Sequence, residues 1–159
     1  MNTDFPIPYI NWSVLMPVLV VATTGIVALV IEMLAPRRNN NVVVGASLIG
    51  LVAAGGFALN LFGAESGWHV AQMVLLDHFG TALQFLMIAA CAVCFLFSER
   101  YLREKGIAFA EFYPLALWAT AGGMVMVSTS NLLMLFLGLE ILSIALYCLT
   151  GMSRSEHRS

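Results

Sequence analysis

The stretch NLLMLFLGLEILSIALYCLTG, from Asn131 to Gly151, is long enough and apolar enough to cross a membrane as one helix. A hydrocarbon core about 30 Å thick needs about 20 helical residues. The only charged residue in the stretch is Glu140, which lies about 13 Å along the helix from Asn131 and therefore near the middle of a bilayer. The stretch predicts a transmembrane helix that carries a carboxyl group at depth.

The rest of the chain has the same apolar character. Of its 159 residues, 60% are hydrophobic and 10% are charged, whereas about 25% are charged in ordinary soluble domains. We therefore predict an integral membrane protein of the all-α class, a polytopic transmembrane helix bundle in contact with the lipid bilayer. One bundle covering residues 1–159 is expected, with five spans at about residues 12–34, 42–62, 79–98, 112–129 and 131–150.

The positions of Lys and Arg predict the orientation of the bundle. All seven follow the first, third or fifth predicted span, and they are Arg37, Arg38, Arg100, Arg103, Lys105, Arg154 and Arg158. Because internal loops of membrane proteins carry an excess of Lys and Arg, we expect the N-terminus outside and the C-terminus inside. The small separate groups and the net charge of −2 offer no basic surface for nucleic acid, so no such partner is expected.

Small residues form a stripe along the second predicted span. Ala46, Gly50, Ala54 and Ala58 recur every four residues and would lie on one face of a helix. Small side chains let two helix backbones approach closely in a membrane. The stripe predicts that another helix packs against this face.

The sequence offers no cofactor-binding or metal-binding residues. Cys91, Cys94 and Cys148 lie inside apolar runs and are too few for a four-ligand metal site or a cluster. Cys91 and Cys94 have C-x-x-C spacing, but a membrane-embedded helix does not provide the access that a redox pair needs. No glycine-rich dinucleotide-binding motif occurs either.

The depth of Glu140 suggests a role in proton transfer. Placing a charged side chain at the bilayer centre costs on the order of 3 kcal/mol, and keeping an ordinary glutamic acid protonated at pH 7 costs about 3.7 kcal/mol. Because the two costs are comparable, modest changes in surroundings could load or unload a proton. No Lys or Arg of this chain lies within reach at that depth, so a balancing cation would have to come from elsewhere.

Ser143 and Tyr147 lie three and seven residues after Glu140 and on the same side of the predicted helix. They would either support Glu140 by hydrogen bonding or serve only as backbone-bonded and packing residues. Glu32, close to Arg37 at the end of the first span, is expected to be an interfacial anchor. Asp77 and His78 are more simply solvated loop residues than the border of a proton exit.

Three strings, NLLMLFLGLEILSIALYCLTG, LLDHFGTALQ and SERYL, resemble the N-type antiporter-like membrane subunit of proton-pumping NADH:quinone oxidoreductase, respiratory complex I. The resemblance runs over all five predicted spans and covers only the N-terminal third of that longer subunit. It implies that the fifth helix carries a Glu that pairs with a Lys on a later helix, within a row of protonatable groups. Glu140 is the residue of this chain that matches that Glu.

The resemblance also implies a function. The chain is expected to be a membrane-arm subunit of a redox-driven proton pump in the bacterial cytoplasmic (inner) membrane, taking part in proton translocation coupled to NADH oxidation and quinone reduction. NADH, FMN, iron–sulfur clusters and quinone would bind to partner subunits, and the other membrane-arm subunits would be its partners. Two alternatives stay open, a cation/proton antiporter subunit and a structural or assembly protein in which Glu140 only packs.

Overall fold

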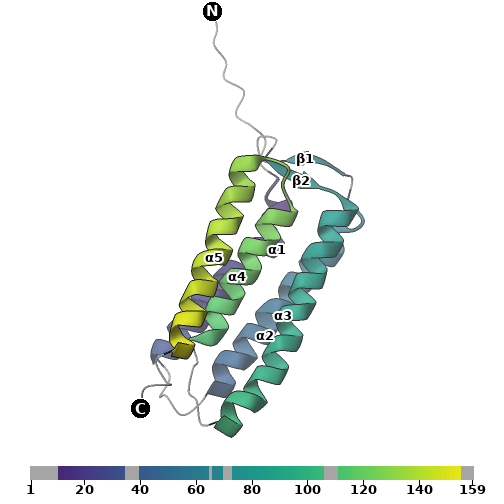
Figure 1. Ribbon diagram of the computed structural model, residues 1–159. Helices are drawn as coiled ribbons and strands as arrows, with labels where there is room; N and C mark the ends of the chain where they lie inside the picture. The colour runs from purple at the N-terminus through teal and green to yellow at the C-terminus, as the bar shows by residue number, and fades with distance from the viewer. Residues whose placement is uncertain (1–10, 35–39, 65, 70–72, 106–110, 155–159) are drawn as a thin grey trace, which may run out of the picture.

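The described residues form five helices and one short hairpin. The computed structural model describes residues 11–34, 40–64, 66–69, 73–105 and 111–154. The elements in chain order are α1 (Trp12–Leu34), α2 (Asn40–Leu61), β1 (Gly67–His69), β2 (Val74–Leu76), α3 (His78–Lys105), α4 (Phe112–Val127) and α5 (Leu132–Arg154). The helices lie lengthwise beside one another, and the hairpin sits at one end of the bundle (Figure 1). The predicted all-α class is confirmed.

Four of the five helices have the length and composition of membrane spans. Within the described residues, α1, α2, α3 and α5 each contain an apolar helical stretch of 20 to 23 residues. The fourth helix, α4, has 16 residues and spans about 24 Å, less than the thickness of the hydrocarbon core. It ends two residues before the predicted end of the fourth span because the Ser128 amide and hydroxyl both donate to the Val125 carbonyl. Five crossings and an external N-terminus remain predictions.

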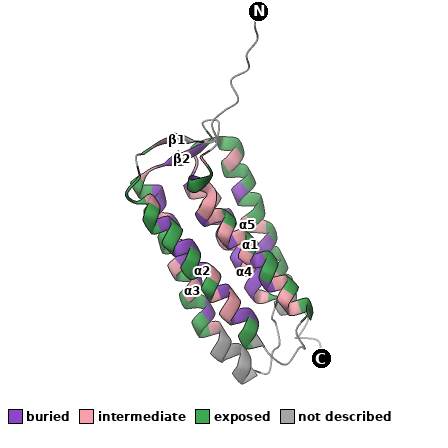
Figure 2. Ribbon diagram, turned by 180° about the vertical axis from the view of Figure 1, so that it is seen from behind, coloured by how far each residue is buried: buried purple, intermediate pink, exposed green. Residues whose placement is uncertain are grey.

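The shortest helix is the centre of the bundle. α4 packs against α1, α2, α3 and α5, and its Leu117 and Met124 side chains are fully buried. The Trp118 indole N–H donates to the Ala22 carbonyl of α1 at 3.3 Å. Its ring fills the space that a side chain at Gly25 would occupy. Buried residues line the facing sides of the helices, and exposed residues line their outer sides (Figure 2).

The small-residue stripe on α2 packs against another helix, as predicted. A Cβ atom on Gly50 would overlap the side chain of Thr24 on α1, and Ala54 and Ala58 are fully buried. The Thr24 hydroxyl donates to the Val20 carbonyl of its own helix at 2.6 Å, so it enters this contact already hydrogen-bonded. At Gly50, the neighbour is therefore a helix of the same chain.

The structure contains a β-hairpin between α2 and α3 that the sequence does not predict. β1 pairs antiparallel with β2, with Gly67 opposite Leu76. The Leu75 amide donates to the Ser128 carbonyl at 2.9 Å, and the Thr129 hydroxyl donates to the Met73 carbonyl. These bonds attach the hairpin to the turn between α4 and α5, which lies more than fifty residues further along the chain.

Asp77 and His78 have structural partners at the start of α3. The Gly80 amide donates to the Asp77 carboxylate at 2.9 Å, so Asp77 caps the first turn of the helix. The His78 ring nitrogen Nδ1 lies 3.3 Å from the Ser66 hydroxyl. The His78 ring also meets Phe62 edge-on, with ring centroids 6.3 Å apart. Capping of α3 explains the position of Asp77 without a role in proton release.

Candidate functional site

The orientation of Glu140 is set by a glycine contact between α4 and α5. A Cβ atom on Gly122 would lie 2.8 Å from the Gly138 carbonyl oxygen, and one on Gly138 would lie 2.8 Å from the Gly122 carbonyl oxygen. The two helix backbones therefore touch directly at this pair. Such contact requires the absence of side chains on both helices. Gly138 marks the side of α5 that faces the bundle.

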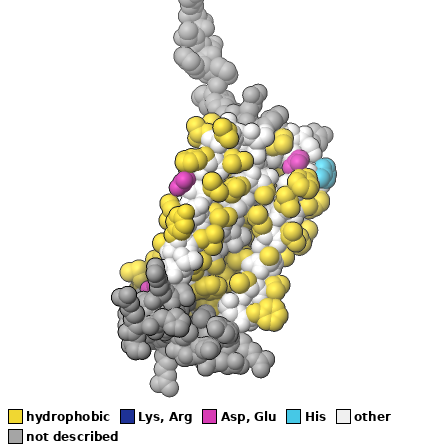
Figure 3. Space-filling view, viewed as in Figure 1, with side chains coloured by type: hydrophobic (Ala, Val, Ile, Leu, Met, Phe, Trp, Pro, Cys, Tyr) yellow, Lys and Arg dark blue, Asp and Glu magenta, His cyan; other side chains and the backbone are white. Residues whose placement is uncertain are grey.

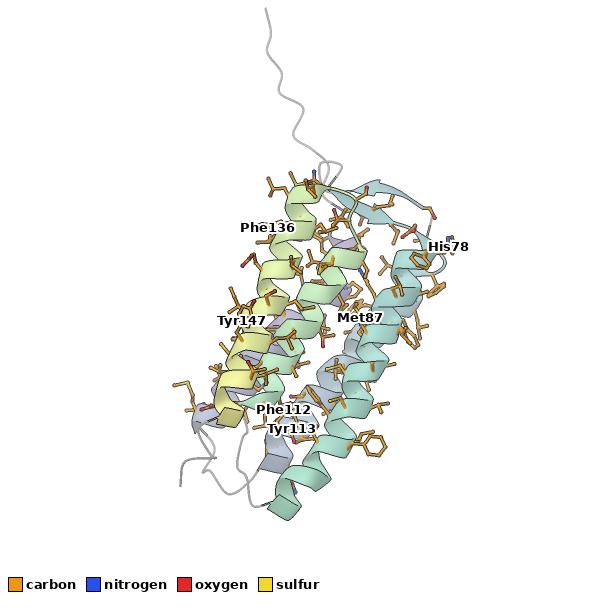
Figure 4. All side chains as sticks on the ribbon, viewed as in Figure 1. His78, Met87, Phe112, Tyr113, Phe136 and Tyr147 are labelled. Atoms are coloured by element: carbon orange, nitrogen blue, oxygen red, sulfur yellow. The ribbon has the colours of Figure 1, made fainter. Side chains whose placement is uncertain are left out.

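Glu140 lies on the opposite side of α5. Two residues correspond to a rotation of about 200° around a helix, so Glu140 points away from α4 when Gly138 points toward it. The structure places Glu140 among the exposed residues. Phe136 and Tyr147 occupy the same outer side of α5 (Figure 4), with 59% and 73% of their surfaces exposed.

The surroundings of Glu140 within the chain are apolar. Its neighbours Leu139 and Ile141 are partly exposed hydrophobic residues, and hydrophobic side chains cover much of the face of the bundle seen in Figure 3. Glu140 forms no hydrogen bond or ion pair with any other residue that the structure describes. It lies near the middle of the candidate span Leu132–Gly151. A carboxyl group therefore lies midway along a candidate membrane span without a polar partner from the described part of this chain.

Ser143 and Tyr147 differ in how they relate to Glu140. Tyr147 lies about two turns after Glu140 on nearly the same outer side of α5, because seven residues make close to two helical turns. Ser143 is turned toward the edge of that side and is half-buried. Across the described residues, neither side chain is hydrogen-bonded to Glu140. A supporting role for these two residues remains a prediction.

The sequence of this chain is similar to that of known membrane proteins. No protein-family model matches it. It is 32% identical over 155 residues to NADH-quinone oxidoreductase subunit N of Trichlorobacter lovleyi, covering 94% of this chain and 31% of that protein. With subunit N 2 of Roseiflexus castenholzii the identity is 34% over 157 residues, covering 99% and 31%. The chain is homologous to the N-terminal third of NADH-quinone oxidoreductase subunit N.

The homology to subunit N extends over the whole chain. NAD(P)H-quinone oxidoreductase subunit 2 of Gloeobacter violaceus is 30% identical over 159 residues, covering 100% of this chain and 31% of that protein. The chain thus spans about a third of the length of the curated relatives it matches. The resemblance seen in the sequence is confirmed. Four apolar helices and bacterial membrane relatives make this subunit N homologue an integral membrane protein.

In the part of the subunit N homologue that the structure describes, the other His, Cys, Asp and Glu residues do not gather into a site. Among the described residues, no three His, Cys, Asp or Glu side chains are grouped so that they could hold a metal ion. Cys91 is buried and Cys94 is exposed, and both are free thiols. Glu32 lies half-buried in the last turn of α1. The nearby Arg37 and Arg38, which were expected to lie beside it, are outside the described residues.

Two features of the subunit N homologue are not among the predictions from its sequence. Gly138 is a packing residue, and its signal in the sequence is that it is the only glycine between Gly123 and Gly151 and interrupts an otherwise bulky apolar run. Gln84, on α3, is the second such residue. Its side chain is 6% exposed, and its signal in the sequence is an amide inside an apolar run.

Proposed function

We propose that the chain is part of a membrane-arm subunit of proton-pumping NADH:quinone oxidoreductase, respiratory complex I, and that Glu140 is a proton-relay residue of that subunit. The observation that carries the proposal is the homology to subunit N over nearly the whole chain. The position of Glu140 adds support, since its carboxyl group is at mid-span on an outward face. That face is open to a helix that is not among the five described.

The proposed relay depends on a cation that approaches and leaves Glu140. A Lys on a later helix of the full subunit would stabilise the Glu140 carboxylate while it is close. When that Lys moves away, the carboxylate would be left in an apolar environment, and protonation would become its cheaper state. Alternation between the two arrangements would load and release one proton at Glu140. Tyr147 shares the outer face about 10 Å further along α5, and in this proposal it would hold water that hydrogen-bonds to the carboxylate.

Electron transfer belongs to partner subunits in this proposal. NADH, FMN, iron–sulfur clusters and quinone would bind there, and quinone reduction would drive the change around Glu140. The chain would associate with the other membrane-arm subunits through its exposed apolar faces. Isolation together with flavin and iron–sulfur subunits distinguishes this function from that of a cation/proton antiporter.

The proposal is tested with the variant Glu140→Gln in the complete complex. Glutamine keeps the shape and the hydrogen-bonding capacity but removes the titratable group. Loss of a positioned acid–base group slows its proton transfer by about 100-fold or more, so the number of protons translocated per NADH oxidised should fall. The amount of assembled complex should stay at the wild-type level.

Glu111→Gln is the matched control. Glu111 is exposed at the start of α4, and its side chain makes no capping hydrogen bond. Its substitution should leave both the proton-to-NADH ratio and the assembly unchanged. If the Glu140→Gln complex assembles normally and pumps at the wild-type ratio, Glu140 is not a proton-relay residue and has only a packing role.

A further inference from the structure

Gln84 presents a buried amide without a protein partner. It lies in the first half of α3, and 6% of its surface is exposed. Its side chain forms no hydrogen bond with any residue in the described part of the chain. A buried amide left without a hydrogen bond costs about 1–3 kcal/mol. Such a group in a native protein calls for a physical explanation.

The same face of α3 carries a second polar group one turn away. Thr81 is 5% exposed, and its hydroxyl donates to the Asp77 carbonyl at 2.8 Å. The hydroxyl oxygen therefore still has lone pairs with which it can accept a bond. Residues three apart on a helix are neighbours, with Cβ atoms about 5–6 Å from one another. Thr81 and Gln84 thus present one free acceptor and one free amide side by side.

The C-terminal end of α4 lies against this face. A Cβ atom on Gly80 would be 2.8 Å from the carbonyl oxygen of Val127, the last residue of α4. The final carbonyls of a helix have no partner within the helix, and no described residue donates a hydrogen bond to the Val127 oxygen. Two buried polar side chains of α3 and a helix-end carbonyl of α4 without a donor among the described residues therefore lie in the region where α3 meets α4 at Gly80.

A small polar ligand would satisfy all three groups. Gln84 is too deeply buried for a side chain of another protein to reach it, because 6% of its surface is exposed. Water is small enough, and buried waters typically make about three hydrogen bonds to otherwise unsatisfied groups. One water molecule could accept from the Gln84 amide nitrogen and donate to the Thr81 hydroxyl and the Val127 carbonyl. Its donors and acceptors would then be matched.

We propose that Gln84, Thr81 and Val127 form a buried water-binding site between α3 and the C-terminal end of α4. Gln84 lies seven residues from the capping residue Asp77, so the site is about 10 Å inside the end of the bundle that carries the hairpin. The bound water joins α3 to α4 at a point where Gly80 brings the two backbones together. This site is separate from Glu140, which lies on the outer side of α5.

Electron cryo-microscopy of the wild-type protein in its membrane assembly tests the site directly. A map that resolves ordered waters should show a peak about 2.7–3.2 Å from the Gln84 side-chain nitrogen or oxygen. The peak should also lie within hydrogen-bonding distance of the Thr81 hydroxyl or the Val127 carbonyl. An amide surrounded only by carbon atoms, or bonded directly to another protein group, would overturn the proposal.

Substitutions provide a second readout. Gln84→Leu should lower the midpoint of thermal unfolding if the amide holds a structural water, and should raise it if the amide is simply unsatisfied. Gln84→Leu and Thr81→Val should be non-additive in a double-mutant cycle, because both residues bind the same water. Ile88→Leu, one turn further along the same buried face, is the matched control and should shift the midpoint little. A raised midpoint for Gln84→Leu, or strict additivity, would contradict a shared water.

Discussion

The absence of side chains at two glycines fixes which side of α5 faces α4. Gly122 and Gly138 allow carbonyl oxygens to lie where a Cβ atom would otherwise be. Because the carboxylate of Glu140 is about 200° around the helix from Gly138, this contact also determines that Glu140 faces outward. A packing residue therefore controls the environment of the candidate relay residue without touching it.

The substitution Gly138→Ala should destabilise the chain by about 1–3 kcal/mol, because the added methyl group forces α4 and α5 apart. Gly56→Ala is the control, since a Cβ atom there would meet nothing within 4 Å. Alanine at that helical position should be neutral or stabilising by up to about 1 kcal/mol. Unfolding midpoints in the same detergent would measure both effects. Equal behaviour of the two variants would show that the glycine contact does not hold α5 in place.

At the scale of the elements, α1 and α2 form a closely packed pair. Gly50 receives the side chain of Thr24, and Ala54 and Ala58, which follow on the same side of α2, are fully buried. At Gly50, the small-residue stripe of α2 therefore packs against α1 of the same chain and not against another subunit. A bulky residue at Gly50 should accordingly damage folding first and incorporation into a larger assembly as a consequence.

The prediction for this pair compares Gly50→Leu with Gly45→Leu. Leucine at position 50 would collide with Thr24, whereas a Cβ atom at position 45 meets no atom within 4 Å. Gly50→Leu should reduce the amount of folded chain recovered from membranes severalfold, since overpacking costs about 1–3 kcal/mol. Gly45→Leu should be recovered at the wild-type level. Recovery can be followed by fluorescence-detected size-exclusion chromatography. Normal recovery of Gly50→Leu would show that the stripe is not part of the interface between α1 and α2.

At the scale of the whole molecule, the alternating direction of the helices groups the chain segments at two ends. α1, α3 and α5 finish at one end of the bundle, and the hairpin and the α4–α5 turn lie at the other (Figure 1). In the sequence, every Lys and Arg follows the end of α1, lies in the last two turns of α3, or lies at or beyond the last residue of α5. The arrangement is consistent with all positive charge on one side of the membrane, and the side itself stays a prediction from the positive-inside rule.

Cysteine labelling in intact cells measures the orientation. In a background where Cys91, Cys94 and Cys148 are replaced by Ala, a cysteine at Ala64 should react with a membrane-impermeant thiol reagent added from outside. A cysteine at Ala108 should react only after the membrane is opened. The reverse pattern would show that the N-terminus lies inside, and labelling of both positions from outside would require a different number of crossings.

Much of this protein could be predicted from its sequence because membrane helices are specified locally. Apolar composition and a fixed rise per residue are enough to identify five helices and to place Glu140 near mid-span. The similarity to subunit N was also visible in short strings of residues. None of these features requires knowledge of which residues from distant parts of the chain meet.

Only the tertiary structure decides which sides of the helices face one another. The central place of the short helix α4, the outward direction of Glu140, the burial of Gln84 and the hairpin bonded to the α4–α5 turn all depend on such contacts. In a chain that is apolar on nearly every helix face, hydrophobicity cannot distinguish an inner face from an outer one. Close approach at Gly50, Gly122 and Gly138 makes that distinction, because it depends on the shape of both partners at once.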